Sequence, residues 1–154
     1  MGKAIQAYLV LYNASCLVGW AYALYAGLTQ TDVLGGGWEA LAGVWAVSGP
    51  TVLIVQSAMT LEIFHAGLGF VRSPVVVTAM QVTSRLWVML CPAYGDGSSS
   101  WTGMMVISWA MVEVIRYSFY LAALLMKVIP YPIFYARYSA FAILYPTGIA
   151  GDLG

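Results

Sequence analysis

Residues 4–31 read AIQAYLVLYNASCLVGWAYALYAGLTQT, and this stretch contains no charged side chain. A bilayer with a hydrocarbon core about 30 Å thick is crossed by roughly 20 apolar residues in helical form. The stretch therefore predicts a first transmembrane helix over about residues 5–28. The apolar run continues past Trp20 and Tyr22, which favours a membrane span over a short cleavable signal peptide.

Four more apolar segments follow the first one. We expect spans over about residues 41–61, 74–90, 101–126 and 131–149, separated by connections that contain glycine, proline or charged residues. The composition agrees, because only 8% of the 154 residues are charged, against about 25% in a soluble domain. The sequence predicts an all-α, multi-pass transmembrane helical bundle, formed as one domain over residues 1–154 in a lipid bilayer.

Charge and metal-ligand content argue against several functional classes. Six basic residues balance six acidic ones, so there is no electrostatic basis for binding nucleic acid. The single histidine is His65, and Cys16 and Cys91 have no metal-ligand spacing. We therefore expect no metal site and no redox cofactor.

The basic residues near the predicted span ends indicate an orientation. Lys3, Arg72 and Lys127 fall at the N-terminus, in the second loop and in the fourth loop, all on one side of the membrane. The first and third loops contain acidic residues but no Lys or Arg. Since basic loops stay in the cytosol, we expect a cytosolic N-terminus.

Polar side chains recur along one face of three predicted spans. They are Thr78, Gln81 and Arg85, then Glu113, Arg116, Tyr117 and Tyr120, and finally Arg137, Phe141 and Tyr145 with Tyr138 beside them. An arginine at mid-membrane costs at least ~2.5 kcal/mol on insertion scales, so each should face the bundle interior and find a partner. The rows predict a polar cavity, and the alternative is hydrogen bonding that only holds helices together.

The sequence indicates an acidic partner for one of these arginines and none for the other two. Glu113 can neutralise Arg116, which is one helical turn away on the same span. Arg85 and Arg137 have no acidic residue nearby in sequence. We expect each of these two to pair with an acid from another helix or with an anionic ligand.

Three runs, taken in order, resemble the very-long-chain (3R)-3-hydroxyacyl-CoA dehydratase family, also called protein-tyrosine-phosphatase-like A proteins. They are LEIFH at 61–65 with the residues up to Arg85, EVIRYSFY at 113–120, and RY at 137–138 with LYPTG at 144–148. The resemblance implies a six-span protein of the endoplasmic reticulum membrane that catalyses the third step of fatty-acid elongation. Five spans are visible here, and we expect the sixth to be missing.

The resemblance also implies a catalytic pair. Tyr145 matches the tyrosine of the family's Leu-Tyr-Pro-x-Gly motif, and Gly148 matches its glycine. Asp152 stands where the family has a glutamate, one methylene longer. Loss of water from a 3-hydroxyacyl-CoA needs one group to take the C2 proton and another to protonate the leaving C3 hydroxyl. A tyrosine and a carboxylate can divide this work, and which is acid and which is base stays open.

Six further residues are interpreted as supporting or substrate-binding groups. These are Arg85, Glu113, Arg116, Arg137, Tyr138 and Gly148. The resemblance implies an acyl-CoA substrate, with coenzyme A as part of it and no further cofactor. It also implies partnership with the condensing enzyme, the ketoacyl reductase and the enoyl reductase of elongation.

Other interpretations compete with the dehydratase. The shorter Asp152 and the missing span favour, as an alternative, an inactive paralogue that serves as a membrane scaffold for elongase or signalling partners. The segment from His65 to Ser73 has the His-x6-Arg-Ser frame of a cysteine phosphatase. Its nucleophile position is occupied by Ala66, so phosphocysteine chemistry is excluded.

Overall fold

The computed structural model describes residues 2–31, 33–71, 74–94, 99–126, 131–132, 135–136 and 139. Within these ranges the chain forms helices and no strand. The predicted all-α class is therefore confirmed.

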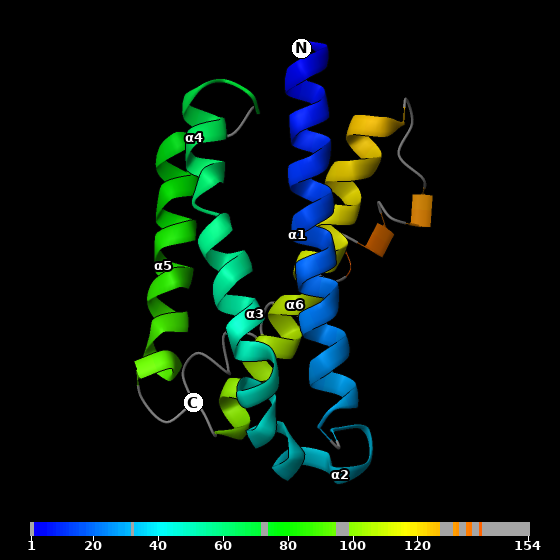
Figure 1. Ribbon diagram of the computed structural model, residues 1–154, viewed down its shortest axis with the longest axis vertical. Coiled ribbons are helices and arrows are strands. Elements are labelled where there is room, and N and C mark those ends of the chain that lie inside the picture. Colours follow the sequence, from blue (N-terminus) through cyan, green and yellow to red (C-terminus); the bar gives the residue numbers. More distant parts are fainter. Residues whose placement is uncertain are drawn as a thin grey trace.

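The helices follow one another along the chain as shown in Figure 1. They are α1 (Lys3–Thr29), α2 (Val33–Ala40), the 3-10 helix η1 (Leu41–Gly43), α3 (Val44–Ala58), α4 (Leu61–Gly67), α5 (Val75–Tyr94) and α6 (Ser100–Leu125). Three segments of the described chain, Lys3–Thr29, Leu34–Gly67 and Ser100–Leu125, are long and apolar enough to cross a membrane, and Val75–Leu90 is a shorter apolar helix. A multi-pass helical membrane protein is confirmed, whereas the number of spans stays a prediction.

Two connections contain more helix than the sequence suggests. Residues after 61 were expected to form a polar connection, but α4 continues the helical path of α3 after a turn at Met59 and Thr60. The path continues because the amide of Glu62 donates to the carbonyl of Met59 at 3.0 Å, which keeps the turn compact. The glycine-rich loop after α1 likewise contains α2, interrupted at Gly37 with a φ of +66°.

Close helix approach fixes the bundle around α1, which packs against α6 and α3. A Cβ atom added to Gly19 of α1 would overlap the side chain of Val55 of α3, and one added to Gly103 of α6 would overlap the backbone of Leu41. Glycine is therefore required at both crossings. The fully buried Trp20 lies in the core that these helices share.

Large apolar side chains cover much of the outside of the bundle. Leu11, Val18, Ile54, Val76 and Trp87 are each at least 68% exposed. In water such a surface would be costly, but in lipid it is solvated by acyl chains. The start of α1, the helix α4, the start of α5 and the end of α6 lie toward the same end of the bundle (Figure 1).

Candidate functional site

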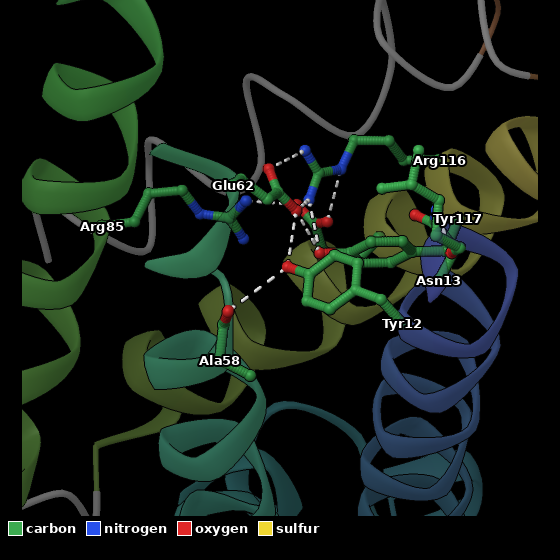
Figure 2. A network of polar contacts seen from close by, with 9 residues as sticks. Tyr12, Asn13, Ala58, Glu62, Arg85, Arg116 and Tyr117 are labelled. Atoms are coloured by element: carbon green, nitrogen blue, oxygen red, sulfur yellow. Dashed lines mark hydrogen bonds and ion pairs between the residues drawn. The ribbon is translucent and has the colours of Figure 1, made fainter. Parts of the chain in front are cut away.

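Charged residues from three helices meet inside the bundle, as Figure 2 shows. We call Glu62 of α4, Arg85 of α5, and Glu113 and Arg116 of α6 the ionic cluster. Glu113 is 1% exposed and forms an ion pair with Arg85, while its second oxygen accepts a hydrogen bond of 2.7 Å from Nε of Arg116. Two expectations are thereby confirmed: Glu113 neutralises Arg116, and Arg85 finds its acid on another helix.

The guanidinium of Arg116 also forms a bidentate ion pair with Glu62. Its Nη1 donates to Oε2 at 3.2 Å and its Nη2 donates to Oε1 at 3.1 Å. Such paired bonds fix both distance and orientation. Glu62 therefore ties α4 to α6, and the cluster has two positive and two negative groups, with a formal charge of zero.

Two tyrosines complete the coordination of Glu62. The hydroxyl of Tyr117 donates to Glu62 Oε1 at 2.5 Å, and the hydroxyl of Tyr12, from α1, lies 3.3 Å from the same oxygen. Nη2 of Arg116 in turn donates to the Tyr117 oxygen at 2.9 Å. Through these contacts α1, α4 and α6 share one hydrogen-bonded network (Figure 2).

Aromatic rings flank both arginines. The guanidinium carbon of Arg85 lies 4.3 Å from the ring centre of Trp109 and 5.9 Å from that of Trp20. Arg116 lies 4.6 Å from the ring centre of Tyr117. Cation–π attraction of this kind strengthens when water is excluded, so the rings help to keep both charges in place.

The single histidine of the chain joins α4 to α1. His65 is 4% exposed, and its Nε2 lies 2.9 Å from the hydroxyl of Tyr8. The edge of one ring faces the other between His65 and Tyr12, with ring centres 4.7 Å apart. His65 therefore packs between the two helices at the side of the ionic cluster.

A cavity of about 900 Å³ opens beside the cluster. Its polar lining residues are Tyr12, Asn13, Glu62, His65, Thr78, Gln81, Arg116 and Tyr120. Its apolar lining includes Ile5, Leu9, Phe119, Ala123 and Leu124. A cavity is present at the predicted rows, but its lining is partly apolar. Thr78, Gln81 and Arg116 line it, whereas Arg85 and Glu113 are not lining residues and pair with each other between helices.

Several predicted site residues lie outside the part of the chain that the structure describes. These are the proposed catalytic pair Tyr145 and Asp152, together with Arg137, Tyr138 and Gly148. Among the residues that are described, no group of three His, Cys, Asp or Glu side chains could hold a metal ion.

The sequence did not indicate the part that α1 plays. Tyr8 and Tyr12 are one turn apart on the same helix face, which was the only available signal. Nothing in that spacing links them to His65 and Glu62, which come 50 or more residues later. The Glu62–Arg116 pair was missed for the same reason.

The fold and the cluster define a multi-pass helical membrane protein with an ionic centre beside an amphipathic cavity. The model of the family described as "Protein tyrosine phosphatase-like protein, PTPLA" matches residues 56–154. The chain belongs to this family.

Its relatives are named as dehydratases. The very-long-chain (3R)-3-hydroxyacyl-CoA dehydratase hpo-8 of Caenorhabditis elegans is 41% identical over 97% of this chain and 68% of its own length. Very-long-chain (3R)-3-hydroxyacyl-CoA dehydratase PASTICCINO 2B of Oryza sativa subsp. japonica is 38% identical over 100% of this chain and 69% of its own. Very-long-chain (3R)-3-hydroxyacyl-CoA dehydratase 2 of Mus musculus is 36% identical over 99% of this chain, which spans 59% of the mouse protein. No solved structure matches the chain.

Proposed function

We propose that the protein dehydrates very-long-chain (3R)-3-hydroxyacyl-CoA to trans-2-enoyl-CoA, the third step of fatty-acid elongation. The observation that carries this proposal is the family membership, with relatives named as such dehydratases at 36–41% identity over nearly the whole chain. A cavity with both polar and apolar walls beside a buried ionic cluster supports it, because an acyl thioester has polar and apolar parts.

The reaction is an elimination that Tyr145 and Asp152 would carry out between them. The C2–H bond breaks, its electron pair forms the C2=C3 double bond, and the C3–O bond breaks with the oxygen leaving as water. One residue of the pair accepts the C2 proton and the other donates a proton to the leaving hydroxyl. Arg137, Tyr138 and Gly148 would support this pair.

Arg85, Glu113 and Arg116 would act as positioning residues in this scheme. Their charges are matched by one another and by Glu62. Each of these groups already contacts a charged partner, which favours a structural role over direct contact with the substrate. The network instead fixes α4, α5 and α6 relative to one another, and active-site geometry depends on such supporting contacts.

The setting proposed for the reaction is the membrane of the endoplasmic reticulum, with the N-terminus in the cytosol. The substrate would bring coenzyme A with it, and no further cofactor is assigned. The condensing enzyme, the ketoacyl reductase and the enoyl reductase of the same pathway would be the partners.

The test is an assay of the full-length membrane protein with 3-hydroxyacyl-CoA, in which enoyl-CoA formation is followed by mass spectrometry. We expect turnover in the wild type and its loss in Tyr145→Phe, because the phenol oxygen is removed while the ring stays. Asp152→Asn should also abolish turnover, and Asp152→Glu should retain or increase it.

The scaffold alternative makes the opposite prediction for the wild type. It is favoured by the aspartate at position 152, because a misplacement of about 1 Å can cost roughly 100-fold in rate. A folded wild type that produces no enoyl-CoA, together with activity in Asp152→Glu, would contradict the dehydratase proposal for this chain.

A further inference from the structure

The lining of the cavity beside the ionic cluster is both apolar and polar. Ile5 and Leu9 of α1 and Ala123 and Leu124 of α6 contribute apolar side chains, which together we call the apolar wall. Asn13 of α1, His65 of α4, and Thr78 and Gln81 of α5 contribute neutral polar groups. A ligand that fills the cavity would therefore contact both hydrocarbon and hydrogen-bonding side chains.

The charged residues of the lining do not leave a free cation for an anionic ligand. Of the described lining residues, Glu62 and Arg116 are the charged ones, and they bind each other at 3.1 Å. Arg116 is also bound to Glu113 at 2.7 Å. A phosphate is usually held by arginine or lysine groups that are not already neutralised. The described walls therefore suit an uncharged ligand.

The neutral lining residues keep hydrogen-bonding capacity for such a ligand. Asn13 donates through its amide nitrogen to the carbonyl of Leu9 at 2.8 Å, so its side-chain oxygen is left to accept. Thr78 donates to the carbonyl of Pro74 at 2.9 Å, and its hydroxyl oxygen can still accept. Gln81 adds a complete amide. Acceptors and donors of this kind fit secondary amides.

We propose that this cavity binds the pantetheine arm and the thioester of the acyl-CoA, and that the nucleotide phosphates of coenzyme A stay outside it. Pantetheine is uncharged, carries two secondary amides, and has methylene and methyl groups that fit the apolar wall. The cavity volume of about 900 Å³ lies within the roughly 300–1,000 Å³ of small-molecule sites. The inference rests on the proposed function for the identity of the substrate.

The test measures binding without turnover. S-butyl thioethers of coenzyme A, of pantetheine and of N-acetylcysteamine cannot be dehydrated, and their dissociation constants can be determined by calorimetry on the purified full chain in detergent. We expect coenzyme A and pantetheine thioethers to bind within about threefold of each other. The N-acetylcysteamine thioether lacks one amide, the dimethyl group and both hydroxyls, and we expect it to bind at least about tenfold more weakly.

Substitutions of lining residues test whether the thioethers bind in this cavity. Ala123→Trp fills the space beside the apolar wall and should weaken the pantetheine thioether at least about tenfold. Leu125→Trp is the matched control, because Leu125 is 64% exposed, is on the same helix and is not a lining residue. Gln81→Leu, at an exposed position that should not disturb folding, should weaken the pantetheine thioether about threefold.

Each outcome has a defined meaning. Binding of the coenzyme A thioether more than tenfold tighter than the pantetheine thioether would assign the affinity to the phosphates and overturn the proposal. Unchanged binding in both Ala123→Trp and Gln81→Leu would place the ligand elsewhere. The expected binding pattern without enoyl-CoA formation would keep the cavity assignment and contradict the proposed function alone.

Discussion

Two buried polar regions of the bundle differ in how their polar atoms are satisfied. In the ionic cluster, Glu113 binds both arginines and Glu62 binds Arg116 and two tyrosines, although Nε of Arg85 is buried without a hydrogen-bond partner among the described residues. Gln56 of α3 is 0% exposed, yet neither its side-chain oxygen nor its nitrogen has a hydrogen-bond partner among the described residues.

The difference predicts which buried polar groups stabilise the bundle and which do not. A buried polar group without a partner costs roughly 1–3 kcal/mol, whereas removal of one partner from a buried ion pair costs about 3–5 kcal/mol. We therefore expect substitutions in the ionic cluster to be strongly destabilising and substitutions of Gln56 to be tolerated.

Glu113→Leu should have the largest effect, a loss of about 3–5 kcal/mol of stability, because it leaves Arg85 buried without its acid. The measurement is unfolding in mixed micelles with increasing SDS. The double variant Arg85→Met/Glu113→Leu is the control, since it removes the stranded charge and leaves Arg116 with Glu62. Stability of the double variant should exceed that of Glu113→Leu, and a lower value would show that the cluster does not depend on charge balance.

Arg116→Lys should cost roughly 2–3 kcal/mol although the charge is kept. A lysine ammonium cannot replace both the bidentate pair with Glu62 and the Nε–H hydrogen bond to Glu113. Lys3→Arg, at an exposed helix end, is a matched exchange in the opposite direction and should change stability by less than about 0.5 kcal/mol. Wild-type stability in Arg116→Lys would mean that charge alone holds α4 to α6.

The sequence predicted more of this cluster than of its surroundings, for a physical reason. Glu113 and Arg116 are one helical turn apart, so the pair follows from helix geometry alone. The partner of Arg85 could be predicted only as an acid on another helix, since its identity depends on how α5 and α6 pack. The sequence places Glu62 in a polar connection, because α4 is short and only its apolar residues indicate a helix there.

The fold shows the same division between local and long-range information. Long charge-free runs such as residues 4–31 predict helices because the bilayer leaves few alternatives for an apolar backbone. The contact of Tyr8 with His65 joins residues 57 positions apart. Local periodicity carries no information about such a pair, and neither does it place Tyr145 and Asp152 relative to the cavity.

Tyr117→Phe should cost about 1–3 kcal/mol, and Tyr12→Phe about 0.5–1 kcal/mol. Both tyrosines bind Oε1 of Glu62, but Tyr117 does so at 2.5 Å and Tyr12 at 3.3 Å. Short bonds from a hydroxyl to a carboxylate are among the stronger ones. The two variants are matched because each removes one hydroxyl, and a reversed order of their unfolding midpoints in SDS would contradict the ranking.

Gln56→Met should have the smallest effect, between no change and a gain of about 1 kcal/mol in stability. Methionine has a similar length and no polar atoms, so the substitution removes the unsatisfied amide and keeps the packing volume. The control is Gln56→Glu, which puts a charge at the same fully buried position and should destabilise by several kcal/mol. A loss of 2 kcal/mol or more in Gln56→Met, measured by the same SDS titration, would show that the Gln56 amide makes stabilising hydrogen bonds. The contrast between Gln56 and the ionic cluster would then disappear, because both would stabilise the bundle through their polar contacts.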